Sequence, residues 1–141
     1  MLSTVKSIIQ TSFPSFRDER GVLSAYEAND IVPYEIARIF IVSSNSEKYR
    51  GHHAHIACSQ LMVCVSGECI LKCDDGSEKR EFVLDNQSQG VLIPPMIWTE
   101  QFYLKDSTSI MVICDRPYEK DDYIREYQEF LSRRAIFKEE S

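Results

Sequence analysis

Short segments rich in β-branched, aromatic and apolar residues run through most of this sequence, and turn residues separate them at close intervals. Segments of this composition are predicted to be strands: Val22–Tyr26, Ile36–Val42, Gln60–Val65, Cys69–Cys73, Glu81–Leu84, Val91–Ile93, Trp98–Leu104 and Ser109–Cys114. The Asp75-Gly76 pair between two of them is typical of a hairpin turn. Many short strands at this spacing favour a β-sandwich or barrel, formed as a single domain over residues 1–141.

One helix is expected, near the C-terminus. Asp121 and Asp122 would occupy its first turn and Arg133 and Arg134 its last, where their charges suit the helix dipole. We expect one face of this helix to pack on the barrel or on a partner subunit, because apolar residues repeat along it at helical spacing: Tyr123, Tyr127, Phe130 and Leu131.

Composition and charge argue against a nucleic-acid-binding, membrane-spanning or secreted protein. The formal net charge of −6 argues against nucleic acid as a partner. No apolar run approaches the roughly 20 residues that a membrane-spanning helix needs. The N-terminal residues lack the basic and apolar regions of a signal peptide, so we expect a cytoplasmic protein.

The cysteines are odd in number and form no C-x-x-C pair, which argues against a disulfide scaffold or a zinc knuckle. Most of their neighbours are apolar strand residues. We therefore expect buried, reduced thiols at all of these positions: Cys58, Cys64, Cys69, Cys73 and Cys114.

All 3 histidines fall between positions 52 and 55. In a strand, His53 and His55 would point to one face and His52 to the other, so the first two are predicted to share a site. The spacing from His53 and His55 to Gln60 and Gly67 is that of a cupin metal motif, but Gln60 stands where the acidic ligand belongs.

The companion cupin motif would supply a third histidine after a turn. Here that turn is Pro94-Pro95-Met96, and Thr99 occupies the ligand position. Two imidazoles and a neutral amide are poor ligands for a hard or borderline divalent cation. We therefore predict no metal and no organic cofactor, and expect the two histidines to transfer protons.

Several motifs together resemble the nucleotide-sugar 3,4-ketoisomerases, WxcM-like small cupins of deoxysugar biosynthesis. The resemblance runs from about residue 18 to residue 131 and is carried by these segments: Asp18-Glu19-Arg20-Gly21, Pro33-Tyr34-Glu35-Ile36-Ala37-Arg38, Arg50-Gly51-His52-His53-Ala54-His55, Gln60, Gly67, Ile93-Pro94-Pro95-Met96-Ile97-Trp98 and Asp122-Tyr123-Ile124-Arg125. It implies an all-β fold, a cupin or double-stranded β-helix (jelly-roll) barrel with one C-terminal helix.

The resemblance also implies an activity. Members of this family move the ketone of dTDP-4-keto-6-deoxyglucose from C4 to C3, act as homodimers and need no cofactor. Their product is passed to a pyridoxal-phosphate aminotransferase, in the biosynthesis of 3-amino-3,6-dideoxyhexoses for cell-surface glycans such as O-antigens and S-layer glycans. Exposed edge strands at Ser7–Gln10 and Val22–Tyr26 would suit dimerisation.

The family's paired catalytic histidines fall on His53 and His55. We expect His55 to remove the C3 proton and His53 to assist, by returning a proton to C4 or polarising an oxygen, although the two roles could be exchanged. The family's motif arginines fall on Arg38 and Arg50, which we expect to contact the diphosphate. Gln60 and Arg38 are candidates to stabilise an enediolate, and Trp98 could stack on the thymine or serve as a core residue.

The sequence departs from the family at Tyr34, where many relatives carry Phe, and at Ile56, where many carry Lys. Relatives also often carry an aromatic hydroxyl in the strand around Phe40-Ile41, and none is present there in this sequence. If that hydroxyl donates a proton in relatives, another group must do so here. Two further readings remain open: a metal-dependent, dioxygenase-like cupin enzyme and a non-catalytic nucleotide-sugar-binding cupin. The residue motifs of a 3,5-epimerase are not found.

Overall fold

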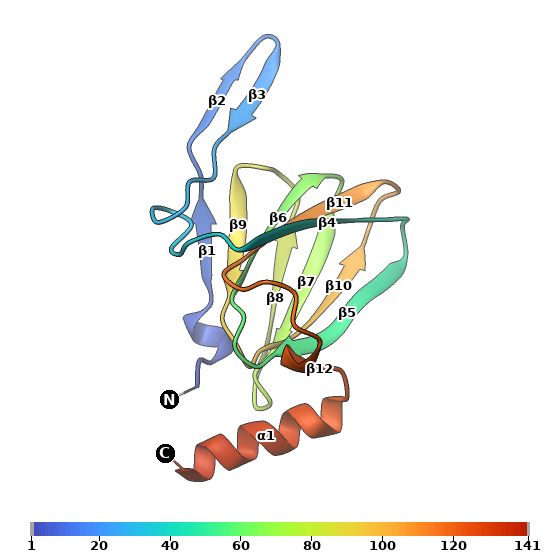
Figure 1. Cartoon of the computed structure of the whole chain (residues 1–141). Coiled ribbons are helices and arrows are strands. Elements are labelled where there is room, and N and C mark those ends of the chain that lie inside the picture. Colours follow the sequence, from blue (N-terminus) through green and yellow to red (C-terminus); the bar gives the residue numbers. More distant parts are fainter. Residues whose placement is uncertain (1, 141) are drawn as a thin grey trace.

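The computed structural model describes the backbone of residues 2–140 and the side chains of residues 2–137. Two five-stranded antiparallel sheets face each other and form the barrel (Figure 1). The first contains, in spatial order, β1 (Ile9–Ser12), β9 (Gln89–Ile93), β6 (Gln60–Ser66), β11 (Thr108–Cys114) and β4 (Arg38–Ser44). The second contains β12 (Tyr123–Ile124), β5 (Lys48–His55), β10 (Trp98–Tyr103), β7 (Cys69–Asp74) and β8 (Lys79–Leu84).

Alternation along the strands builds the core. On β6, Met62 and Cys64 point into the barrel, while Leu61 and Val63 belong to a separate cluster on the other face of the sheet. All five cysteines are free and buried, as the sequence predicted. The all-β, jelly-roll expectation is confirmed.

Each predicted strand has a counterpart, and the hairpin turn is confirmed between β7 and β8. Asp75 accepts hydrogen bonds from the amides of Ser77 and Glu78 at 2.9 and 2.7 Å, and Gly76 has a φ of 91°, a conformation that favours glycine. This local chemistry explains why the turn was readable from sequence.

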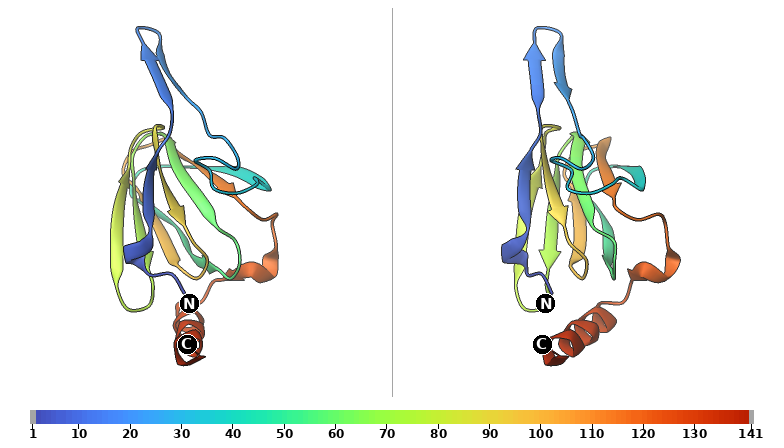
Figure 2. Two further views of the ribbon diagram at one scale, coloured as in Figure 1. Left: turned by 90° about the vertical axis from the view of Figure 1, so that its left-hand side faces the viewer. Right: turned by 60° about the vertical axis from the view of Figure 1, so that its left-hand side comes forward.

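The segment predicted at Val22–Tyr26 is part of a hairpin outside the barrel. β2 (Ser15–Asp18) and β3 (Gly21–Ser24) pair only with each other, and Figure 2 shows them projecting well beyond the two sheets. Phe16 and Leu23 are direct partners in this hairpin, and both are exposed.

The C-terminal helix begins later than predicted. α1 spans Tyr127–Glu140, whereas the short 3-10 helix η2 (Lys120–Asp122) and strand β12 precede it; another 3-10 helix, η1 (Val5–Ser7), lies near the N-terminus. Tyr123 and Ile124 pair with β5, so the main-chain hydrogen bonds of a sheet replace those of a helix there.

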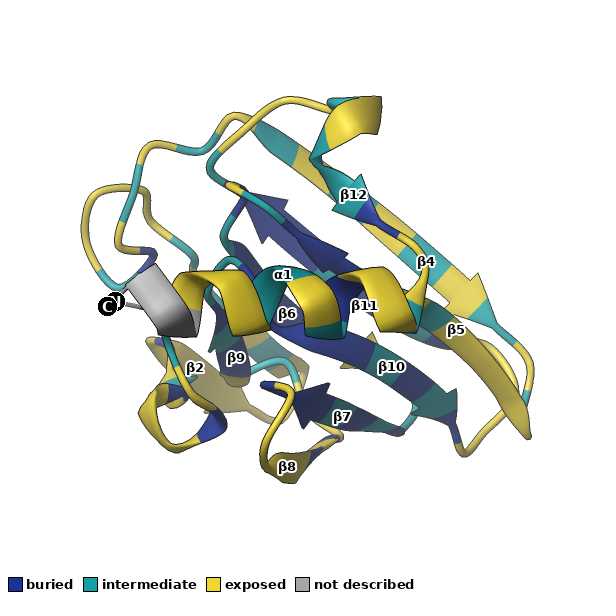
Figure 3. Ribbon diagram, turned by 90° about the horizontal axis from the view of Figure 1, so that it is seen from below, coloured by how far each residue is buried: buried dark blue, intermediate teal, exposed yellow. Residues whose placement is uncertain are grey.

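α1 crosses one end of the barrel with its outer side exposed (Figure 3). The predicted packing face is confirmed for Tyr127, Phe130 and Leu131, which join a cluster with Trp98. Arg134 secures the helix by donating hydrogen bonds to the carbonyls of Met96 and Ser3. Within residues 2–140, no helix is both long and apolar enough to cross a membrane.

Candidate active site

A β-bulge at His52 sets the directions of the neighbouring side chains. His53 lies opposite Thr99 of β10 and Gly51 lies opposite Glu100, which leaves His52 between them without a partner. Its φ of 53° is left-handed, and its Nδ1 lies 3.6 Å from the Glu100 carboxylate. His52 therefore points away from His53, as the sequence predicted.

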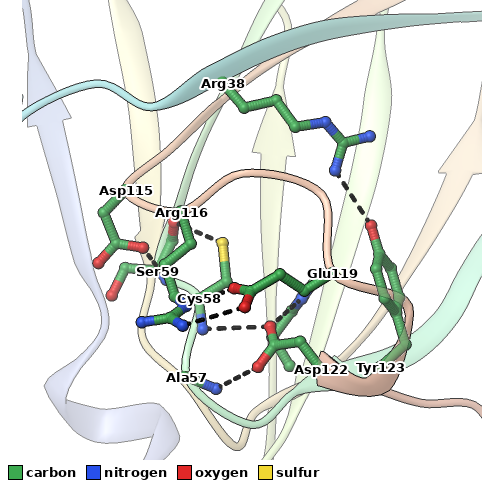
Figure 4. A network of polar contacts seen from close by, with 10 residues as sticks. Arg38, Ala57, Cys58, Ser59, Asp115, Arg116, Glu119, Asp122 and Tyr123 are labelled. Atoms are coloured by element: carbon green, nitrogen blue, oxygen red, sulfur yellow. Dashed lines mark hydrogen bonds and ion pairs between the residues drawn. The ribbon is translucent and has the colours of Figure 1, made fainter.

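His55 is the most deeply buried histidine, with 6% of its surface exposed. Its Nδ1 lies 2.9 Å from the Asp122 carboxylate, which also accepts the amides of Ala57 and Cys58 at 2.7 and 3.3 Å (Figure 4). Burial lowers the pKa of His55 and outweighs the opposing effect of Asp122. Since a carboxylate can only accept, Nδ1 of the neutral ring carries the hydrogen.

The other ring nitrogen of His55, Nε2, is buried and has no hydrogen-bond partner among the described side chains and main chain. In this tautomer Nε2 carries a lone pair. A fixed, unprotonated nitrogen inside the barrel is suited to act as a general base.

His53 has the same arrangement in a half-buried position. Its Nδ1 lies 3.0 Å from the carbonyl oxygen of Gly51, so this nitrogen donates and Nε2 keeps a lone pair. Burial is the main cause that lowers the pKa of His53 to about 4. The two imidazole centroids are 5.2 Å apart, which confirms that His53 and His55 share one face.

Tyr123 completes this group. It is the direct cross-strand partner of His55, and its ring centroid lies 4.3 Å from that of His55 and 5.2 Å from that of His53. Its hydroxyl accepts a hydrogen bond of 3.4 Å from Arg38 (Figure 4). The sequence reading missed Tyr123 and Asp122 because both were assigned to the helix.

Arg38 begins β4, where its guanidinium lies over the rings of Phe40 and Tyr118 at 4.5 and 5.0 Å. Among residues 2–137, no carboxylate lies within ion-pair distance of it. Two acidic residues have other partners: Glu68 pairs with Lys105, and Glu100 contacts His52 and Trp98. Arg38 therefore lies near the imidazoles with its positive charge not neutralised by any carboxylate of residues 2–137.

Gln60 and Arg50 occupy different positions relative to this group. Gln60 is buried at the start of β6, on the face that points into the barrel, and its Cα partner on β11 is Cys114. Arg50 is exposed and lies opposite Gln101, further along β5 from the imidazoles. The structure brings Gln60 into the barrel interior, but it gives Arg50 no contact with the histidines.

The structure places Trp98 in the core, which is one of the two roles that the sequence left open for it. Thr99 faces His53, so the alternation of β10 turns Trp98 to the opposite face. There its ring packs against Tyr127 and Phe130 at centroid distances of 5.3 and 5.7 Å, and its indole N–H donates to Glu100. Trp98 is a core residue beneath α1.

One group of potential metal ligands lies within this region: His55, Cys58 and Asp122 have ligand atoms within 4.8 Å of one another. The Asp122 oxygens already accept from His55, Ala57 and Cys58, however, and the Cys58 thiol donates to the Ser59 carbonyl. A hydrogen bond with Cys114, together with burial, raises the pKa of Cys58 and favours the thiol. A metal ion would need Cys58 as its thiolate, but the surroundings favour the thiol. These three side chains therefore fit an internal hydrogen-bond network better than a metal centre.

Comparisons with known proteins identify the family of this chain. A curated relative, the TDP-4-oxo-6-deoxy-α-D-glucose-3,4-oxoisomerase of Aneurinibacillus thermoaerophilus, is 35% identical over 120 residues, covering 84% of this chain and 86% of its own. The TDP-quinovose 3,4-ketoisomerase WlaRB of Campylobacter jejuni superposes with a TM-score of 0.84 at 30% identity, covering 91% of this chain and 99% of that one.

The sugar 3,4-ketoisomerase QdtA of Thermoanaerobacterium thermosaccharolyticum, solved with TDP, has the same fold. Its TM-score is 0.89 at 23% identity, with 94% of this chain and 98% of that chain covered. The family model described as "FdtA: WxcM-like, C-terminal" matches residues 6–135. This chain, with its paired imidazoles inside a jelly-roll barrel, therefore belongs to the FdtA family of WxcM-like proteins.

Proposed function

We propose that this protein is an isomerase that moves the ketone of dTDP-4-keto-6-deoxyglucose from C4 to C3 without a cofactor. The observation that carries the proposal is the pair of neutral imidazoles, each held through Nδ1 so that Nε2 carries a lone pair on the inner face. Membership of the FdtA family and the activities named for the relatives supply the substrate class.

The chemistry requires removal of the C3 proton, an enediol intermediate and delivery of a proton to C4. His55 is the better candidate for the base, because Asp122 fixes its ring and stabilises the imidazolium that forms. His53, 5.2 Å away, can assist in returning the proton to C4. General acid–base catalysis of this kind contributes about 10²–10⁴-fold to a rate.

Two inner-face groups can bind the negative charge of substrate and intermediate. The guanidinium of Arg38 has no carboxylate partner among residues 2–137; it lies beside Tyr123 and suits either the diphosphate or a developing enediolate. Gln60 can donate its amide hydrogens from the neighbouring sheet. Arg50, exposed on β5, could contact only a part of the ligand that extends away from the imidazoles.

We also propose that the protein is a homodimer. The projecting hairpin exposes Phe16 and Leu23, which are 69% and 60% accessible, and the edge strand β4 exposes Ile39 and Ile41 at 54% and 60%. Apolar surface at a sheet edge favours association with a second copy. Light scattering at micromolar concentration should give twice the 16.3 kDa chain mass, and a monomer mass would contradict the proposal.

In this scheme the protein works in the cytoplasm, and its 3-keto product is consumed by a pyridoxal-phosphate aminotransferase that installs an amine at C3. The pathway would lead to 3-amino-3,6-dideoxyhexoses of cell-surface glycans. This placement follows from the chemistry of a 3-keto sugar, since a ketone is the group that such an aminotransferase accepts.

Turnover after chelation tests the proposed function. Protein treated exhaustively with a chelator is mixed with dTDP-4-keto-6-deoxyglucose, and carbon NMR follows the ketone. We expect the C4 carbonyl signal to be replaced by one at C3, and the proton couplings of the product to report the configuration at C4. An unchanged sugar, or turnover that one added metal restores, would contradict the proposal.

A further inference from the structure

The resting site contains two bases and no protonated imidazole. The Gly51 carbonyl and the Asp122 carboxylate can only accept hydrogen bonds, so they hold the hydrogen of each neutral ring on Nδ1. Burial favours the neutral form of both rings. Neither histidine therefore has a proton on Nε2 to give at the start of the reaction.

The first half of the proposed reaction needs an acid as well as a base. When the C3 proton leaves, the electron pair of the C3–H bond forms the C3–C4 double bond, and the carbonyl electrons move to O4. O4 must then receive a proton to give the neutral enediol. A side chain that is protonated in the resting enzyme has to supply it.

Tyr123 has the position that this role requires. Its register opposite His55 fixes the phenol on the same face as both imidazoles, at centroid distances of 4.3 and 5.2 Å. The hydroxyl oxygen accepts from Arg38, so its own hydrogen remains available to a ligand. Arg38 itself can stabilise an anion, but it stays protonated throughout.

We propose that Tyr123 is the catalytic acid that protonates O4 and later recovers the proton from O3. This inference rests on the proposed ketoisomerase function and adds a residue to it. It gives a specific use to the short strand β12, which pairs with β5 only at His55 and Ala54.

The proton balance closes with these groups alone. In the first step the imidazole takes the C3 proton and Tyr123 gives its proton to O4, leaving an imidazolium and a phenolate. In the second step the O3 hydroxyl returns a proton to the phenolate as the C3 ketone forms. The imidazolium, after its proton has exchanged with solvent, protonates C4 as the C3–C4 double-bond electrons form the new C4–H bond, and every enzyme group regains its starting state.

Several charged or titratable groups surround the phenol and set the conditions of the test. They are His53 and His55 of β5, Arg38 of β4, Arg125 over the ring at 4.5 Å, and Tyr118 at a ring distance of 5.7 Å. Arg38 and the imidazolium would both stabilise a transient phenolate by charge attraction.

The test replaces one hydroxyl and keeps the ring. Tyr123→Phe should lower kcat by about 10²-fold with little change in KM, the loss typical of a missing general acid. Tyr49→Phe is the matched control: it removes a hydroxyl from an exposed ring on β5 that contacts Lys72, and it should leave kcat unchanged. Both proteins should retain the wild-type circular dichroism and melting temperature within a few degrees.

The pH profile separates a catalytic role from a packing role. Replacement of Tyr123 by 3-fluorotyrosine, whose phenol is more acidic, should move the alkaline fall of kcat to lower pH. A Tyr123→Phe protein with kcat within threefold of wild type, or an alkaline limb that the fluorine does not move, would overturn the inference. Wild-type protein with no isomerase activity would instead overturn the proposed function, so the two failures are distinguishable.

Discussion

The two faces of the strand pair β5 and β12 differ in polarity, packing and chemistry, although neighbouring residues of the same strands form them. The inner face carries His53, His55 and Tyr123, whose polar atoms include a buried nitrogen without a hydrogen-bond partner among the described residues. The outer face carries Ala54 and Ile124, which pack with Met96, Trp98 and Phe130 beneath α1.

The outer face contributes mainly to the stability of the fold, and the inner face carries the groups suited to catalysis. Packing on the outer face follows the ordinary rule that buried apolar surface stabilises, at about 25 cal/mol per Å². On the inner face, burial disfavours the charged imidazoles, and His55 Nε2 has no hydrogen-bond partner among the described residues. We infer that the outer face holds the two strands in register so that the inner face can keep reactive groups in place.

The largest expected effect comes from removing the buried base. His55→Asn keeps an N–H group near Asp122 but removes Nε2, so turnover should fall by about 10³-fold while the fold remains intact. Steady-state kinetics and circular dichroism check both parts. Retention of most of the wild-type rate would remove His55 from the mechanism.

A substitution on the outer face should have the opposite signature. Phe130 is fully buried against Trp98, and Phe130→Ala should lower the free energy of unfolding by about 3–5 kcal/mol. The kcat of the protein that remains folded should stay within a few fold of wild type. Urea titration with kinetics at low temperature measures both, and a loss of kcat without a loss of stability would contradict the division between the faces.

The inner face should make stability sensitive to acid. The folded-state pKa of His53 is lowered from 6.5 to about 4, so between these values the unfolded chain binds a proton that the folded chain does not. The contribution of the neutral His53 side chain to the free energy of unfolding is therefore fully present above about pH 6.5, and it is lost as the pH falls towards 4. His53→Asn should reduce the loss between pH 7 and pH 5 by about 2 kcal/mol, as measured by urea unfolding at both values. An unchanged pH dependence would contradict the assignment of a neutral His53.

The smallest effect is expected at the bulge. His52 is exposed and has a left-handed φ of 53°, a conformation that glycine adopts without strain. His52→Gly should change the free energy of unfolding by less than about 1 kcal/mol and kcat by less than about twofold. A large loss of activity would mean that this histidine, and not only its two neighbours, belongs to the site.

The sequence predicted the features that depend on local pattern. Enrichment in β-branched, aromatic and apolar residues located the strands, Asp75-Gly76 located a hairpin, and the spacing of His53 and His55 placed both on one face. It failed at Asp122 and Tyr123, where helical spacing competed with pairing to β5, a contact between residues far apart in the chain. The alternation of β10 could have shown that Trp98 and Thr99 point in opposite directions, but not which of them faces the imidazoles.

Exchange of the substrate's C3 proton tests most directly whether the inner face transfers protons. Metal-stripped wild-type and His55→Asn proteins are each incubated with dTDP-4-keto-6-deoxyglucose in deuterated water, and proton NMR follows the signals at C3 and C4. The account predicts a 3-keto product carrying deuterium at C4 with the wild type, and neither product nor exchange with the variant at matched times. Exchange at equal rates in both proteins, or no exchange with the wild type, would contradict it.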